Sequence, residues 1–127
     1  MKTIINTPNA PAPIGPYSQA VVANGMLYAS GQIAINPETG KLETENLQQE
    51  TERVMSNIAA VLEAAHLTFE NVVKCSIFLS SMDLFAEVNN IYGQYFKVDP
   101  PARETVAVKT LPKSVNVEIS VTAVVPQ

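Results

Sequence analysis

The sequence predicts one α+β domain over residues 1–127, with two helices packed on one face of a six-stranded, mostly antiparallel mixed sheet. Three observations lead to this prediction. Apolar and polar residues alternate over 72–79 and 115–124, which is typical of strands. Apolar residues recur every three or four positions over 47–65 and 84–96, which is typical of helices. A chain of 127 residues, 46% of them hydrophobic, is long enough to bury one core.

The N-terminal segment is expected to combine a short strand at 3–5 with a stiff loop at 7–18. The loop carries four prolines, which restrict the backbone and remove hydrogen-bond donors. Tyr17 follows the last of these prolines. Two interpretations remain open: its ring covers the edge of the core, or the loop presents its phenol to a pocket.

Two short strands at 20–23 and 26–30 are predicted to form a hairpin. The Asn24-Gly25 pair between them readily adopts the positive φ angles of a type I′ turn. Gly31 follows directly and permits the close approach of another backbone or of a ligand.

The first helix is expected from about 47 to 65, with Asn46 as its N-cap. His66 then stands where glycine is common after a helix, and histidine tolerates a left-handed conformation better than most residues. We therefore interpret His66 as structural.

The strand at 72–79 is expected to turn Val73 and Cys75 toward the core, where a thiol is not reactive. The second helix is expected from 84 to about 96, with Asp83 as its cap. Its aromatic stripe is typical of a core face.

The stretch 100–108 carries the first candidate functional group. Two prolines fix the backbone just before Arg103, which opens a predicted strand. A guanidinium in this place is suited to bind a carboxylate in bidentate fashion. The alternative is a strand-edge arginine paired with a neighbouring carboxylate.

Glu118 is the second candidate, because it lies in the middle of an alternating strand, where glutamate is depleted. Either it faces solvent or it serves a site. We expect it on the sheet face away from the helices, together with Ser30, Ser76, Thr105 and Ser120. Two helices leave little concavity within one chain, so a pocket between sister subunits is expected.

Composition argues against several classes of function. The net charge of −4 and the absence of a lysine or arginine cluster argue against a nucleic-acid partner. One histidine and one cysteine make a structural zinc site implausible. We expect no membrane partner, because no apolar run approaches the about 20 residues of a membrane span. The single cysteine and the polar start of the chain fit a cytoplasmic protein.

Four short motifs together resemble the reactive intermediate deaminase (Rid, or YjgF-like) family, of the archetypal imine/enamine deaminase type. They are Ile14-Gly15-Pro16-Tyr17-Ser18-Gln19, Ser30-Gly31-Gln32-Ile33, Pro101-Ala102-Arg103 and Val117-Glu118-Ile119. Each motif alone is weak, whereas the four in this order are specific. The resemblance extends from about residue 7 to residue 124. It implies a chorismate-mutase-like fold and a homotrimer with clefts between subunits.

The resemblance also implies an activity, which is the hydrolysis of reactive 2-imino acids or enamines to 2-oxo acids and ammonia without a cofactor. Examples of such substrates are 2-iminobutanoate and 2-iminopropanoate. Arg103 would bind the substrate carboxylate, and Glu118 would hold the attacking water and transfer protons. The cleft would be lined by Tyr17, Ser30, Gly31 and Thr105.

Two positions depart from the family pattern. Thr105 stands where many archetypal members have a cysteine, and Glu104 stands where a serine is frequent. These departures leave the substrate range open.

Two other classes of function remain open. One is a non-catalytic module that binds small 2-oxo acids or amino acids through Arg103. The other is an endoribonuclease or translation inhibitor, an activity ascribed to some relatives. The acidic charge and the lack of a basic, aromatic groove argue against this last class.

Overall fold

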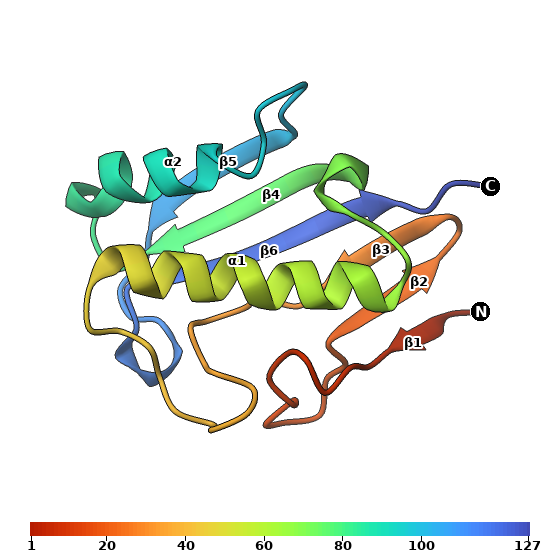
Figure 1. The fold of residues 1–127 in the computed structure, drawn as a ribbon, viewed down its shortest axis with the longest axis horizontal. Coiled ribbons are helices and arrows are strands. Elements are labelled where there is room, and N and C mark those ends of the chain that lie inside the picture. The colour runs from red at the N-terminus through yellow and green to blue at the C-terminus, as the bar shows by residue number, and fades with distance from the viewer.

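A computed structural model describes all 127 residues and confirms the predicted α+β architecture (Figure 1). Two helices lie across one face of a six-stranded sheet with the strand order β1-β2-β3-β6-β4-β5. Neighbouring strands are antiparallel except β4 and β5, which run parallel. The strands are β1 (Thr3–Ile5), β2 (Ala20–Ala23), β3 (Met26–Ala29), β4 (Val72–Leu79), β5 (Ala102–Ala107) and β6 (Val117–Val124), and the helices are α1 (Leu47–Ala64) and α2 (Phe85–Gly93).

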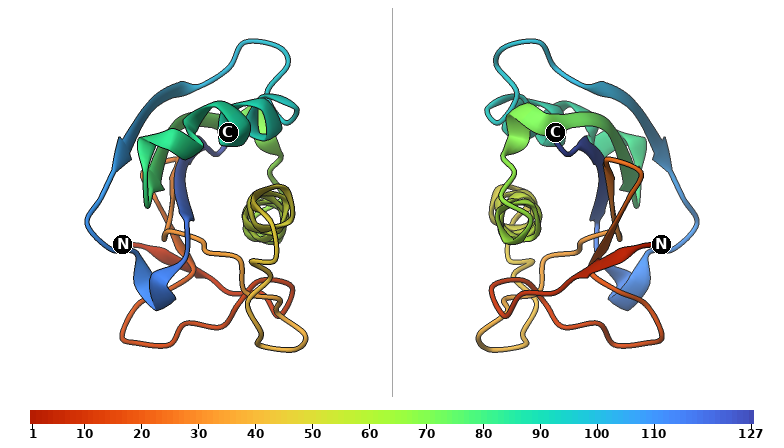
Figure 2. Two further views of the ribbon diagram at one scale, coloured as in Figure 1. Left: turned by 90° about the vertical axis from the view of Figure 1, so that its left-hand side faces the viewer. Right: turned by 90° about the vertical axis from the view of Figure 1, so that its right-hand side faces the viewer.

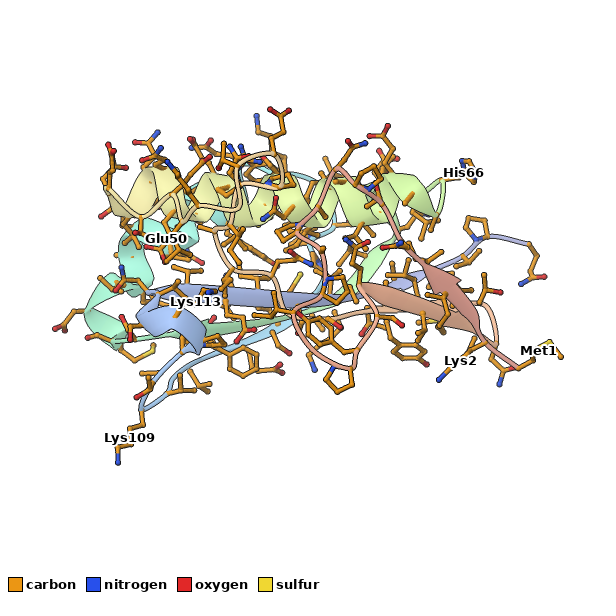
Figure 3. The ribbon with its side chains drawn as sticks, turned by 90° about the horizontal axis from the view of Figure 1, so that it is seen from below. Met1, Lys2, Glu50, His66, Lys109 and Lys113 are labelled. Atoms are coloured by element: carbon orange, nitrogen blue, oxygen red, sulfur yellow. The ribbon has the colours of Figure 1, made fainter.

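The core lies between the helices and one face of the sheet, and the opposite sheet face carries no helix (Figure 2). The helix α1 packs lengthwise over the sheet (Figures 1 and 3). Burial of large apolar side chains, at about 25 cal/mol per Å² removed from water, is the main force that holds the two layers together. The two central elements contribute Val54, Met55, Ile58, Val61 and Leu62 from α1 and Val117, Ile119, Val121 and Ala123 from β6.

The structure confirms three predictions that rest on local backbone preferences. Asn24 and Gly25 have φ angles of 51° and 73°, as the predicted hairpin turn requires. Asn46 caps α1, and its side chain accepts a hydrogen bond from the backbone N–H of Gln49 at 2.8 Å. His66 has a φ of 61°, in the left-handed region expected after the helix.

The expected core position of Val73 is wrong. The pairing of β4 with β6 is irregular between Val72 and Lys74, which indicates a β-bulge. An extra residue at a bulge reverses the alternation of side chains. As a result Val72 is 6% exposed and Val73 is 41% exposed, whereas Cys75 is buried as expected.

The second helix is shorter than expected. A 3₁₀ turn at Met82–Leu84 precedes α2, and Ser81 caps this turn. The N-cap of α2 is Leu84, which makes no side-chain capping bond, so the expected cap at Asp83 is wrong. The Ser81 hydroxyl accepts a hydrogen bond from the backbone N–H of Asp83 at 3.1 Å. α2 ends at Gly93, because glycine is a poor helix former. Neither helix of the structure has the length and apolar composition that a membrane crossing requires.

Candidate functional site

Four of the predicted site residues surround one pocket. Tyr17, Ser30, Gly31 and Glu118 line a cavity of about 410 Å³, which we call the Glu118 pocket. It lies at the sheet face without helices, because Glu118 alternates with the core residues of β6. Much of the remaining wall is apolar and is formed by Pro11, Ala12, Ile14, Ile33, Ile35 and Pro112.

Gly31 lies directly against the carboxyl group of Glu118. Gln32 and Ile119 exchange two backbone hydrogen bonds, of 2.8 and 3.1 Å, and so hold the segment after β3 beside β6. A Cβ atom at position 31 would lie 2.9 Å from Cδ and 3.0 Å from Cγ of Glu118, closer than side chains pack. A side chain at position 31 would therefore displace the Glu118 carboxyl group from its place in the pocket.

Burial raises the pKa of Glu118, and no cation or hydrogen-bond donor of the chain offsets this effect. A carboxyl group with a raised pKa can exchange protons with a substrate closer to neutral pH. Two other side chains that line the pocket form hydrogen bonds with the backbone of the proline loop at 7–18. The Ser30 hydroxyl donates to the carbonyl of Ser18 at 2.7 Å, and the Tyr17 hydroxyl accepts from the backbone N–H of Ile14 at 3.4 Å.

Arg103 lies on the other side of the sheet. It is opposite Cys75 in the parallel pairing of β5 with β4, and it faces the helices. Its Nη1 donates a hydrogen bond to Oδ1 of Asn89 at 2.7 Å. Its Cζ lies 5.0 Å from the ring centroid of Tyr92 and 5.6 Å from that of Phe85. These three α2 residues form one face of the helix, so α2 holds the guanidinium in place.

No carboxylate pairs with Arg103, so the alternative of a structural ion pair is wrong. The two ion pairs of the chain are Arg53 with Glu43, at 3.2 Å, and Lys74 with Glu104, at 3.0 Å. The hydrogen bond to Asn89 occupies one of five N–H donors, and the rest are free for a ligand.

Glu104 faces away from Arg103, on the side of the sheet without helices. It accepts a hydrogen bond from Ser76 as well as pairing with Lys74. These contacts, with that of Ser76 the larger, lower the pKa of the Glu104 carboxyl group. The departure at this position therefore does not neutralise the guanidinium directly.

A cavity of about 460 Å³, the Arg103 pocket, opens beside the guanidinium. Pro100 and Pro101 form part of its wall, and Phe96 and Tyr92 form another part. The prolines that precede Arg103 in the sequence therefore shape the cavity next to it.

Thr105 was expected on the same sheet face as Glu118, and this expectation is wrong. It lies opposite Ile77 of β4, whose side chain is buried beneath the helices, so Thr105 shares the face of Arg103. Its hydroxyl oxygen is buried without a hydrogen-bond partner. Thr105 is not among the residues that line the Arg103 pocket or the Glu118 pocket.

One chain does not bring the two candidate catalytic groups together. Arg103 and Glu118 lie on opposite faces of the sheet, on strands that are separated by β4. Each group opens onto its own pocket. Within a single chain the two groups thus open onto two separate pockets.

Sequence reasoning missed the residues that hold the candidate groups. The spacing of 85, 89 and 92 defines one helical face and was a usable signal, but the aromatic residues on it indicated only a core. Gln19 belongs to the first of the four motifs, but its structural role was not predicted. It is buried and makes four hydrogen bonds to the backbone at Thr7, Ala10 and Pro11, so it orders the proline loop beside the Glu118 pocket. No group of three or more His, Cys, Asp or Glu side chains is placed to hold a metal ion.

Fold and pockets together define a class of small α+β proteins that present an unpaired guanidinium in one pocket and a partly buried carboxyl group in another. The chain belongs to the Rid (YjgF-like) family, because the family model described as "Endoribonuclease L-PSP" matches residues 7–125. Membership of the Rid family, which the four motifs predicted, is thereby confirmed.

Individual relatives match almost the whole chain. A RutC family protein of Synechocystis is 50% identical over 125 residues, which cover 97% of this chain and 96% of the relative. The crystal structure of YyfA, a Rid family protein of Yersinia pestis, is 50% identical with a TM-score of 0.96 and covers 98% and 100% of the two chains. The crystal structure of Escherichia coli TdcF with bound serine is 36% identical with a TM-score of 0.91 and covers 96% and 98%.

Proposed function

We propose that this protein is a deaminase that hydrolyses reactive 2-imino acids and their enamine tautomers to 2-oxo acids and ammonia. The observation that carries the proposal is the guanidinium of Arg103, which has no carboxylate partner and is held by Asn89. A bidentate carboxylate would use its free donors, at about 1.5–3 kcal/mol for each charged hydrogen bond. Substrates of this class carry such a carboxylate next to the reacting carbon.

Glu118 is the proposed acid and base of the reaction. Its carboxylate takes a proton from water as the water oxygen bonds to C2 of the imine, and it passes this proton to the imine nitrogen, which gives a neutral carbinolamine. The carboxylate then takes the hydroxyl proton of the carbinolamine and delivers it to the nitrogen as the C–N bond breaks. Ammonia leaves, the C–O bond becomes the carbonyl of the 2-oxo acid, and Glu118 is again a carboxylate. Gly31 and Ser30 would border this reacting centre, and Tyr17 would close it from the loop.

The complete site requires a second copy of the chain. Arg103 and Glu118 open on opposite faces of the sheet, so we propose that the Arg103 half of one protomer meets the Glu118 half of its neighbour in a homotrimer. The sheet face without helices supports such an assembly, because Tyr28 and Val106 expose apolar side chains there, at 49% and 43%. Thr105 would face the same cleft from beside Arg103.

A second candidate is a non-catalytic module that binds small carboxylates. The serine bound in the relative TdcF favours small carboxylate ligands but does not require hydrolysis. The family model carries the description "Endoribonuclease L-PSP", yet this chain has a net charge of −4, which does not favour binding to a phosphate backbone.

The experiment that tests the proposal generates 2-iminobutanoate with threonine dehydratase and follows its decay in the presence of a trapping nucleophile. The wild-type protein should accelerate the decay, and Arg103→Ala should not. Arg53→Ala is the matched control, because this other arginine is paired with Glu43 away from both pockets. Equal decay with and without the protein would leave the binding module, which calorimetry with 2-oxobutanoate would then test.

A further inference from the structure

Two wholly buried polar side chains of α1 reach out of the core to the chain segments around Glu118. The first is Asn57. Its Nδ2 donates hydrogen bonds to the carbonyls of Ile33, at 3.1 Å, and Ile35, at 3.0 Å. Both isoleucines line the Glu118 pocket. Asn57 therefore turns the backbone of this segment toward the helix while the segment forms one wall of the pocket.

The second buried side chain is Glu50, which lies near the start of α1 (Figure 3). Its carboxylate accepts hydrogen bonds from the backbone N–H of Asn116 at 2.7 Å, from the side chain of Asn116 at 2.9 Å and from the backbone N–H of Val117 at 3.1 Å. Val117 directly precedes Glu118. A buried carboxylate with three donors is a strong local tether for the start of β6.

Residues 50 and 57 are seven positions apart, which is two helical turns, so their side chains leave α1 on the same side. Neither side chain lines the Glu118 pocket. One holds the segment that carries the pocket wall after Gly31, and the other holds the segment that leads into Glu118. The contact between Gly31 and Glu118 is thus fixed from both ends by one helix.

We propose that Asn57 and Glu50 are positioning residues that keep the Glu118 carboxyl group packed against Gly31 and shielded from water. The inference rests on the proposed role of Glu118, which it extends to the helix behind the sheet. Release of either segment would let the pocket wall move and let water reach the carboxyl group.

The groups around Glu118 determine which substitution changes the shielding of its carboxyl group without changing the nearby charge. Tyr17 is the other titratable side chain that lines the pocket. Phe78 is the residue directly opposite Glu118 on β4, and along that face Lys74 and Glu104 pair with each other. Glu50 is itself an acidic group and lies behind the sheet, so its removal would change both the shielding of Glu118 and the acidic groups near it. Asn57 is neutral, and its substitution therefore tests shielding alone.

The test is an NMR titration of the Glu118 carboxyl group, which does not depend on enzymatic activity. The signal is assigned by its loss in Glu118→Gln. In Asn57→Leu we expect the pKa of Glu118 to fall toward its ordinary value, because burial is the cause that raises it. The control is Thr51→Val. Thr51 is wholly buried on the same helix and donates to the carbonyl of Leu47 at 2.8 Å, but it makes no hydrogen bond to either segment.

An unchanged titration of Glu118 in Asn57→Leu, or an equal fall in Thr51→Val, would overturn the inference. If Asn57→Leu does not fold, Asn57→Ser removes the same two-pronged amide donor with a side chain that is too small to clash in the core, and it serves in the same titration. Kinetics separate this inference from the proposed function. If the wild type is a deaminase, kcat should fall on the order of 10- to 100-fold in the Asn57 variant, because the carboxyl group is misplaced. If the wild type shows no deaminase activity, the titration still decides whether Asn57 shields Glu118.

Discussion

The contact between Gly31 and Glu118 places a backbone where any side chain would displace the carboxyl group. Gly31→Ala should therefore move the Glu118 side chain without strain in the backbone, because the φ of Gly31 is not in the left-handed region. We expect kcat to fall on the order of 100-fold. Thermal unfolding measured on the same sample should change little. An active Gly31→Ala protein would show that the packed position of Glu118 is not needed.

Arg103 combines a charge with a planar fork of donors, and a conservative substitution separates the two. Arg103→Lys keeps the charge but loses the fork and the stacking on Tyr92 and Phe85. We expect KM for the imino acid to rise about 10- to 100-fold, since one or more charged hydrogen bonds are lost. Arg53→Lys is the control and should leave KM unchanged. A wild-type KM in Arg103→Lys would mean that charge alone binds the substrate.

The raised pKa of Glu118 also predicts how stability depends on pH. The folded protein retains the Glu118 proton at pH values where the unfolded chain has released it. The resulting stabilisation is complete below the unfolded pKa and is lost as the pH rises through the folded pKa. Glu118→Gln removes this dependence, so its stability relative to wild type should increase as the pH rises through that window.

Urea unfolding at a series of pH values measures this difference. The exposed substitution Glu45→Gln serves as the matched control. A stability difference between wild type and Glu118→Gln that stays constant with pH would contradict a shielded carboxyl group at position 118.

At the scale of elements, the sequence correctly predicted the features of helices and turns that depend only on residues adjacent in the chain. The cap at Asn46, the turn at Asn24 and the left-handed His66 follow from local backbone preferences, and all three were found. The faces of Val73 and Thr105 were wrong, because a bulge and the pairing with a neighbouring strand decide them. These depend on contacts between segments distant in the sequence.

The same limit applies to the candidate site. The motifs identified Tyr17, Ser30, Gly31 and Glu118, which the fold brings to one pocket. The side chains that hold the site come from helices, where a polar residue ordinarily indicates a solvent face. Glu50 and Asn57 instead bond to partners far away in the chain, and no periodicity marks them.

A further prediction concerns the sheet face without helices, which we propose as the interface between subunits. Val106 on β5 is exposed on this face beside Phe78. Val106→Asp should place a charge in the proposed interface and shift the protein from trimers to monomers in sedimentation experiments. Val98→Asp is the control, because Val98 is exposed on the loop before β5 and not on the sheet. A trimer that persists in Val106→Asp would exclude this face from the interface.

At the scale of the whole molecule, the two pockets of one chain are each half of a proposed site. The Arg103 pocket offers a carboxylate-binding group, and the Glu118 pocket offers an acid and base. Neither half alone accounts for hydrolysis of an imino acid. Symmetry provides the missing half at every cleft of a closed ring.

The most direct test of this account mixes two inactive variants. Arg103→Ala and Glu118→Gln are unfolded together in equal amounts and refolded, so that mixed trimers form. A cleft that takes Arg103 from one chain and Glu118 from its neighbour is then intact in about a quarter of cases. The account predicts recovery to about a quarter of the wild-type rate, an estimate that assumes random assembly. Mixed trimers without any recovered activity would contradict it.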